Sequence, residues 1–217
     1  MPKPTAIVTS GPTREKIDPV RFISNFSSGK QGHAVACALR DAGFDVTFVS
    51  GPVNMQPPER VKVINIETAN EMLEACISLL PMDVAVCTAA VCDFKPVEYS
   101  TQKLKKQSGV LESTIKLIQN PDILKTISNH PLRPKVVVGF AAETENLLEN
   151  ARNKLTAKNC NIIVANDVSN GQIFGNDKTS VNIISRHLVE HLDNTDKITV
   201  AKELTIAIIN MLENKNI

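Results

Sequence analysis

The segment Asp83–Ala89 reads DVAVCTA and is a nearly continuous run of apolar and small residues. Such a run is typical of a strand in a parallel sheet that is covered on both faces, because neither face meets water. Comparable short runs recur along the chain, at Thr5–Ser10, Asp45–Ser50, Val61–Ile66, Lys135–Phe140 and Asn161–Ala165. Helical patterns lie between most of them, at Gln31–Ala42, after the capping box of Thr68 and Glu71, and at about Thr144–Lys158. This alternation predicts an α/β fold, a single-domain, doubly wound, mostly parallel (Rossmann-like) sheet spanning residues 1–217.

Several segments depart from the regular alternation. Val181–Ser185 and His187–His191 predict a closing hairpin, and Thr199–Asn214 predicts a terminal amphipathic helix. The stretch around Ser100–Lys116 is polar and rich in lysine, so we expect an inserted mobile arm there. The first strand is followed by a loop from Ser10 to Lys30, and loops of that length in compact domains are usually functional or disordered.

Composition limits the class of protein. The 217 residues are 42% apolar and 22% charged, with 24 Lys and Arg against 23 Asp and Glu and a formal net charge of +1. This balance gives no electrostatic reason to expect a nucleic-acid or membrane-surface partner. The five cysteines are odd in number and form no Cys-x-x-Cys pair, so neither a disulfide framework nor a zinc site is expected. Met1–Pro4 leads into the first strand rather than into a signal peptide, and we expect a cytoplasmic protein.

The first long loop ends in Ser27-Ser28-Gly29-Lys30-Gln31-Gly32, which is similar to a dinucleotide-binding fingerprint with serine in place of the first glycine. Glycines let a backbone approach phosphate, and the N–H groups at a helix start attract anions. A Walker A loop is not indicated, because Ser24 stands where its first glycine belongs and Gln31 follows the lysine. An NAD site lacks its acidic residue, since Ser50-Gly51 follows the second strand. A glycine-rich turn without a ligand remains the alternative.

The next candidate residues follow the fourth predicted strand. Ala89 and Ala90 would let a flat ligand approach closely, and Asp93 could bind its sugar or base, although the alanines equally suit tight helix packing. Lys103 opens a lysine run within the predicted arm. Such a run fits an anion contact or merely a solvated edge.

Two further motifs occur in the second half of the chain. Asn120-Pro121-Asp122-Ile123 predicts a helix start, with Asn120 at the N-cap, proline at the first helical position and aspartate in the first turn. Lys154 and Lys158 are four residues apart on one helix face, where they could meet phosphates or only solvent.

In their order along the chain, these motifs closely resemble the phosphopantothenate–cysteine ligases. The resemblance extends from about residue 5 to residue 185, and its most specific part is the run Asp18–Lys30, DPVRFISNFSSGK. It also includes Gly11-Pro-Thr-Arg-Glu, Ala89-Ala-Val-Cys-Asp, Lys103-Leu-Lys-Lys, Asn120-Pro-Asp-Ile, Gly139-Phe-Ala-Ala-Glu-Thr and Lys154-Leu-x-x-Lys. Cys92 departs from the family pattern, in which alanine is expected.

This resemblance implies a step of coenzyme A synthesis in which 4′-phosphopantothenate is joined to L-cysteine. The bacterial-looking motif Gly11–Glu15 implies CTP, an acyl-cytidylate intermediate, release of pyrophosphate and CMP, and Mg²⁺ on the nucleotide phosphates. The flavin-dependent decarboxylase to which many bacterial ligases are fused has no counterpart in this sequence, so ligase activity is expected without decarboxylase activity or flavin. An ATP-dependent member of the family and a non-catalytic Rossmann-like nucleotide-binding module are the alternatives.

The resemblance also implies roles for individual residues. The nucleotide would contact Gly11, Ala89, Ala90, Asp93, Lys103, Asn120, Pro121, Asp122, Ile123, Phe140, Lys154 and Lys158. Arg21 and Asn25 would hold the acyl end of the substrate, with Asn25 donating hydrogen bonds to the acyl oxygen. The phosphate of 4′-phosphopantothenate would bind Ser27, Ser28, Gly29 and Lys30. The expected catalytic residues are Asn25, Lys103 and Arg21. No metal-ligating side chain is expected. The arm would close over the intermediate, and the family implies a homodimer with the site near the subunit interface.

Overall fold

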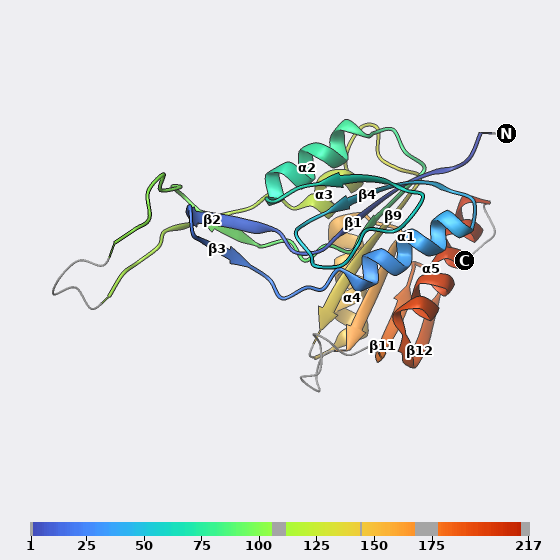
Figure 1. Ribbon diagram of the computed structural model, residues 1–217. Helices are drawn as coiled ribbons and strands as arrows, with labels where there is room; N and C mark the ends of the chain where they lie inside the picture. The colour runs from blue at the N-terminus through green and yellow to red at the C-terminus, as the bar shows by residue number, and fades with distance from the viewer. Residues whose placement is uncertain (1, 106–111, 144, 168–177, 214–217) are drawn as a thin grey trace.

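The computed structural model describes residues 2–105, 112–143, 145–167 and 178–213, and its centre is one eight-stranded sheet (Figure 1). The strand order is β12-β11-β10-β9-β6-β1-β4-β5. These strands are β1 (Thr5–Ser10), β4 (Asp45–Ser50), β5 (Lys62–Asn65), β6 (Val84–Cys87), β9 (Val136–Glu143), β10 (Ile162–Asp167), β11 (Lys178–Ile184) and β12 (Val189–Asp196). Each neighbouring pair from β5 to β10 is parallel, whereas β11 and β12 add the predicted hairpin as an antiparallel edge. The predicted mostly parallel α/β sheet is confirmed.

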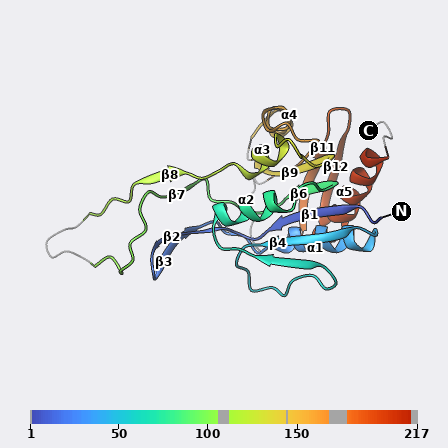
Figure 2. The same ribbon diagram turned by 90° about the horizontal axis from the view of Figure 1, so that it is seen from above.

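Helices cover both faces of this sheet. α1 (Lys30–Asp41) and α5 (Lys197–Leu212) pack on one face, and α2 (Ala69–Ser78), α3 (Ile123–Ser128) and α4 (Leu147–Lys158) pack on the other (Figure 2). Because side chains alternate along a strand, Val8 of β1 is buried with Leu204 of α5, whereas Ile7 is buried in the cluster that contains Leu155 of α4. Two separate hydrophobic layers result. Among the described residues, no helix is long and apolar enough to cross a membrane.

The helix starts follow the local sequence, with one correction. Thr68 begins α2 through the predicted capping box, in which its hydroxyl accepts from the Glu71 N–H at 3.2 Å and the Glu71 carboxylate accepts from the Thr68 N–H at 3.4 Å. The N-cap of α3 is Asp122, whose Oδ1 accepts from the Lys125 N–H at 2.9 Å. Asn120 was predicted to be this cap, but its side chain turns to the carbonyl of Cys92.

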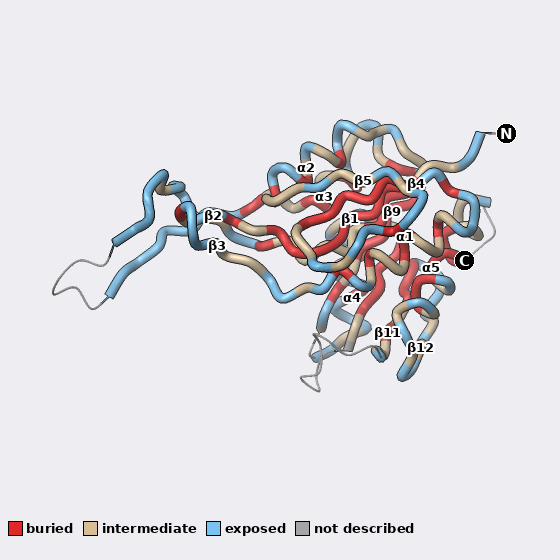
Figure 3. The backbone as a smooth tube through the Cα atoms, in the orientation of Figure 1, coloured by how far each residue is buried: buried red, intermediate tan, exposed pale blue. Residues whose placement is uncertain are grey.

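Two antiparallel ribbons extend from one end of the sheet (Figures 1 and 2). β2 (Arg14–Asp18) pairs with β3 (Arg21–Ser24), and β7 (Phe94–Pro96) pairs with β8 (Leu117–Gln119). The first ribbon corrects the prediction of a plain loop between Ser10 and Lys30. Its short strands lack the long apolar run that marks a core strand, and Figure 3 shows the first ribbon as less buried than the central strands of the sheet. Positions 106–111 of the predicted arm lie outside the described residues.

Candidate active site

A cavity of about 290 Å³ lies at the carboxyl ends of the parallel strands, where sheets of this kind gather their ligands. It is enclosed by the ends of β6 and β9, the start of α3 and one face of α4. Most of the residues expected to contact the nucleotide line it: Ala89, Asp93, Asn120, Pro121, Asp122, Ile123, Phe140, Lys154 and Lys158. The fold therefore brings four separate motifs of the sequence to one place.

Two further cavities continue from the first. The second, of about 260 Å³, lies at the start of α1; the loop Ser27–Lys30 lines it, and it adjoins the first cavity at Ala89 and Phe140, which line both. The third, of about 640 Å³, shares Ser27, Ser28 and Lys30 with the second and extends to Asn25. Because they share lining residues, the three cavities lie side by side, and together we call them the strand-end track.

Close packing shapes the loop that precedes α1. The Ser10 hydroxyl donates to the Gly29 carbonyl at 3.1 Å, and Gly29 has a φ of 73°, a left-handed conformation that favours glycine. A Cβ atom at Gly32 would overlap the hydroxyl groups of Ser10 and Thr88, so α1 can approach β1 and β6 this closely only with glycine at that position. The start of α1 is thereby held at the second cavity, where its N–H groups can attract an anion.

The motif at the start of α3 places two different side chains in the first cavity. Asn120 is buried and donates from Nδ2 to the Cys92 carbonyl at 2.9 Å, while its Oδ1 has no hydrogen-bond partner among the described residues. Asp122 caps α3 and forms an ion pair with Lys158. Burial by itself would raise the pKa of the Asp122 carboxyl, but hydrogen bonds from Lys158 and from the Lys125 N–H outweigh it and lower the pKa.

Asn25 directly follows β3, the second strand of the first ribbon, where the chain returns toward the sheet. Its Nδ2 donates to the carbonyl oxygens of Ala90 at 3.3 Å and Val91 at 3.0 Å. These two contacts engage the amide nitrogen and fix the orientation of the side chain. The atom of Asn25 left for a ligand is therefore Oδ1, an acceptor, whereas sequence analysis expected a donor.

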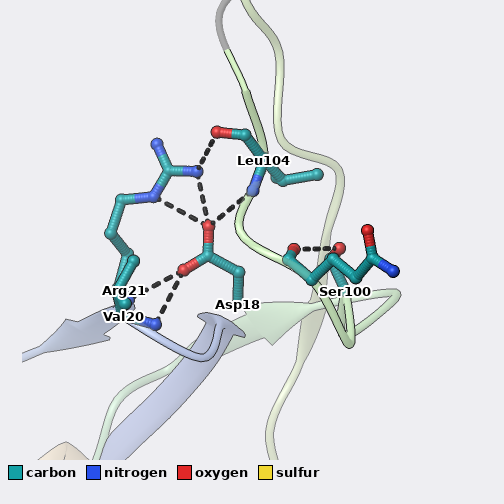
Figure 4. Close-up of polar contacts among 6 residues, drawn as sticks. Asp18, Val20, Arg21, Ser100 and Leu104 are labelled. Carbon is teal, nitrogen blue, oxygen red and sulfur yellow. Dashed lines mark hydrogen bonds and ion pairs between the residues drawn. The ribbon is translucent and has the colours of Figure 1, made fainter.

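Three of the expected site residues do not line the strand-end track. Gly11 instead accepts a backbone hydrogen bond from Ala90 at 2.9 Å, which continues the pairing of β1 beyond its end. Arg21, on β3, directs its guanidinium to the Asp18 carboxylate and to the Leu104 carbonyl (Figure 4). Lys103 is exposed on the arm, next to Leu104.

Residues 2–212 match the family model described as the DNA/pantothenate metabolism flavoprotein C-terminal domain. The chain belongs to this family. A curated relative, the coenzyme A biosynthesis bifunctional protein CoaBC of Haemophilus influenzae, is 42% identical over 203 residues, which are 93% of this chain and 50% of that protein. The protein of the same name from Bacillus subtilis is 44% identical over 180 residues, 82% of this chain and 44% of that protein. The chain spans about half the length of these relatives.

Two solved structures share the fold of this chain. The crystal structure of the C-terminal domain of CoaBC has a TM-score of 0.82 and 39% identity, and the match covers 97% of this chain and 96% of that one. The DNA/pantothenate metabolism flavoprotein from Streptococcus pneumoniae has a TM-score of 0.81 at 22% identity, covering 96% of this chain and 99% of that one. The second likeness shows the fold alone.

The strand-end track also contains residues that sequence analysis did not single out. Arg14 and Phe22 line the third cavity, with the Arg14 guanidinium carbon 4.6 Å from the centroid of the Phe22 ring. Asn166 and Lys197 line the second cavity. Arg14 belongs to the motif Gly11–Glu15, which was a usable signal. Nothing local marks Lys197, since only the packing of the last helix brings it to the track.

Proposed function

We propose that this domain is a phosphopantothenate–cysteine ligase that joins 4′-phosphopantothenate to L-cysteine with CTP as the activating nucleotide. The strand-end track carries the proposal, because its adjacent cavities offer space for a nucleotide at one end and an acyl substrate at the other. The names of the relatives, which refer to coenzyme A biosynthesis, and the order of the motifs along the chain support it.

The nucleotide would occupy the first cavity and extend its phosphates toward the second. There the carboxylate of Asp93 can accept hydrogen bonds from a ribose, and Lys154 supplies positive charge. The loop Ser27–Lys30 borders both the second and the third cavity, so it can contact the nucleotide phosphates as well as the phosphate of 4′-phosphopantothenate. The third cavity would hold the pantothenate chain.

The chemistry requires two displacements. In the first, an oxygen of the substrate carboxylate attacks the α-phosphorus of CTP, and pyrophosphate leaves with the bridging oxygen. In the second, the amine of cysteine attacks the acyl carbon, CMP leaves, and the amine loses a proton. Neither step needs a side-chain nucleophile, so the protein contributes by holding the reactants in line and by neutralising charge.

Asn25 would act in the second displacement. Because its amide hydrogens are bound to the carbonyls of Ala90 and Val91, its Oδ1 can accept a hydrogen bond from the attacking amine and direct the lone pair toward the acyl carbon. This geometry favours orientation of the nucleophile over the earlier expectation of donation to the acyl oxygen.

Mg²⁺ would enter with the nucleotide. The described residues contain no group of three or more His, Cys, Asp or Glu side chains that could hold a metal ion by themselves. The donor set therefore fits an ion held chiefly by the triphosphate, which would neutralise the charge that develops as pyrophosphate leaves.

The proposed enzyme is a homodimer in which a second copy completes each site. Arg21 lies on the first ribbon and Lys103 on the arm, and neither lines the strand-end track of its own chain. The same ribbons expose large apolar side chains, including Phe22 and Ile118, and apolar patches of this kind mark protein–protein contacts. A two-fold dimer through the ribbons would bury these side chains and bring each arm to the partner's track.

Pyrophosphate release tests the function directly. The purified chain is incubated with Mg²⁺, 4′-phosphopantothenate and cysteine, and with CTP, ATP or UTP. We expect release that depends on 4′-phosphopantothenate and is fastest with CTP, together with phosphopantothenoylcysteine detected by mass spectrometry. Faster release with ATP would indicate the ATP-dependent type. Nucleotide binding without any turnover would favour a non-catalytic module.

A further inference from the structure

The turn of the first ribbon contains a buried carboxylate with an unusual set of partners (Figure 4). The side chain of Asp18 is fully buried, although the next two residues of the turn, Pro19 and Val20, are exposed. Its Oδ1 accepts from the N–H groups of Val20 and Arg21, both at 2.9 Å. These two bonds close the turn between β2 and β3, and they leave Oδ2 free to serve another purpose.

Oδ2 of Asp18 connects the turn to the arm. It accepts from Arg21 Nε at 3.0 Å and Nη2 at 2.5 Å, and also from the N–H of Leu104 at 3.1 Å. Arg21 Nη2 in turn donates to the carbonyl of Leu104 at 3.2 Å. Both polar groups of the Leu104 backbone are therefore held, one by the carboxylate and one by the guanidinium. We call this arrangement of Asp18, Arg21 and Leu104 the clasp.

The clasp joins Asp18 and Arg21 to Leu104, which lies far from them in sequence and directly follows Lys103. The peptide bond whose N–H binds Asp18 also contains the carbonyl of Lys103, so the direction of Lys103 depends on that bond. A second backbone contact, from the Ser100 N–H to the Ile17 carbonyl at 3.0 Å, fastens the arm a few residues earlier. The electrostatics agree with a permanently ionised clasp, because hydrogen bonds from Arg21 hold the pKa of Asp18 well below its ordinary value.

We propose that Asp18 is a positioning residue. Through Arg21 and the backbone of Leu104, it orients Lys103 toward the phosphates of the activating nucleotide. This inference rests on the proposed function. It assigns Arg21 a part in supporting the arm, in place of direct contact with the acyl group. A lysine on a long exposed segment has many conformations, and fixing the backbone beside it reduces the entropy that ordering it at the transition state would cost.

Asp18→Asn separates this role from simple support of the turn. The side chain of asparagine can still accept from Val20 and Arg21 through Oδ1, so the turn can close. Its Nδ2 would face the donors Arg21 Nη2 and Leu104 N–H, and donors cannot bind donors. We therefore expect the arm to be released while the sheet and the strand-end track stay intact.

A matched control lies on the same strand. Glu15 is another buried carboxylate of β2, but its Oε1 accepts from the Ala69 N–H at the start of α2 and does not contact the arm. Glu15→Gln keeps this acceptor, so it controls for the loss of a buried charge from β2. Arg21→Lys is a second probe, because lysine keeps the ion pair with Asp18 but lacks the fork that also reaches the Leu104 carbonyl.

The experiment combines hydrogen exchange with single-turnover kinetics on the full chain. In Asp18→Asn, the Leu104 amide should exchange faster, pyrophosphate release should slow on the order of a hundredfold, and the Kd for CTP should change by less than about threefold. Glu15→Gln should resemble the wild type in Leu104 exchange and in pyrophosphate release. In a Lys103→Ala background, adding Asp18→Asn should cause no further loss beyond about twofold, since Asp18 acts through Lys103.

Each alternative result has a distinct meaning. Full, additive loss in the double variant would overturn the positioning role, as would unchanged Leu104 exchange in Asp18→Asn. If Asp18→Asn does not fold, Arg21→Lys supplies the same two measurements, and an unchanged Leu104 amide and rate there would also overturn the clasp. If the wild type releases no pyrophosphate, the proposed function fails, the aiming of Lys103 fails with it, and Leu104 exchange alone decides whether the clasp exists.

Discussion

The sheet and the ribbons differ in how far their apolar side chains are buried. In the sheet, β1, β6 and β9 are covered by helices on both sides, and most of their apolar side chains are almost fully buried. On the ribbons, Phe22 is 47% exposed and Ile118 is 52% exposed, and Phe26, just beyond β3, reaches 83%. Burial of apolar surface is the main driving force of folding. A single chain therefore accounts for the apolar residues of the sheet, but it does not account for the exposed apolar residues of the ribbons.

This difference divides the proposed chemistry between two regions. The first two cavities of the strand-end track, with their lysines, aspartates and the start of α1, belong to the sheet and its helices, whereas Arg14 and Phe22 of the first ribbon line the third cavity. Lys103 and the clasp belong to the ribbons and arm. Nucleotide binding should therefore depend on the sheet alone, whereas turnover should depend on the ribbons and on a second copy.

Asn25→Asp should have the largest effect, because this residue joins the two regions. Aspartate has no N–H to donate to the carbonyls of Ala90 and Val91, and its charge is repelled by them. The side-chain oxygen that would accept from the cysteine amine is therefore no longer held in position. We expect amide formation to slow on the order of a hundredfold or more, with a native melting temperature and unchanged CTP binding. Rapid-quench kinetics should show the cysteine-dependent step slowed more than pyrophosphate release.

Asn129→Asp is the control for that change. Asn129 also donates its side-chain amide to a backbone carbonyl, that of Lys125 at 2.7 Å, but it lies away from the track. Its rate should stay within about twofold of the wild type, as for most surface substitutions. A near-native rate in Asn25→Asp would place Asn25 among structural residues.

Subunit complementation tests whether each site combines two chains. Heterodimers of one Asn25→Asp subunit and one Lys103→Ala subunit, purified through two different tags, should have about half of the wild-type activity per dimer. If each site takes Asn25 from one chain and Lys103 from the other, both substitutions fall in one site and the other site stays intact. If each chain supplied its own lysine, both sites would be damaged and the heterodimer would be as inactive as its parents.

Ile118→Ser should weaken the dimer without destabilising the fold. Loss of an apolar side chain from an interface costs roughly 1.5–3 kcal/mol, which corresponds to an increase in the dimer Kd of about tenfold to 150-fold. Ile206 on α5 is also 52% exposed and is the matched control. Sedimentation velocity over a range of concentrations should show dissociation in Ile118→Ser only, and equal behaviour of the two variants would place the interface elsewhere.

Lys154→Ala should have the smallest effect, confined to the sheet. Loss of one charged contact from the first cavity should weaken CTP binding about fivefold, by roughly 1 kcal/mol, without affecting the dimer. Lys135 lies at the opposite end of the same strands, where it pairs with Asp83, and Lys135→Ala should bind CTP normally. Calorimetric titration that found the same loss in both variants would argue against the first cavity as the nucleotide site.

The residues of the sheet were predictable because local signals agreed there. Asp83–Ala89 and Thr5–Ser10 are apolar runs bounded by turns, and Thr68 with Glu71 forms a capping box that the structure confirms. The first ribbon was missed, because strands that bury little have no strong periodicity. Asn120 was misassigned as a helix cap because Asn and Asp are nearly equivalent caps, and a distant carbonyl decided between them.

By itself, the sequence determined the fold class and the family resemblance, since both depend on patterns within short segments, and the resemblance implied most of the residues that line the first cavity. Only the tertiary structure decided that Asn25 presents an acceptor, that Arg14 and Lys197 reach the track, and that Arg21 supports the arm. Those outcomes depend on which groups of distant segments meet after the helices and ribbons have packed. A hydrogen bond across 83 residues, such as that from Arg21 to Leu104, leaves no periodic trace in the chain.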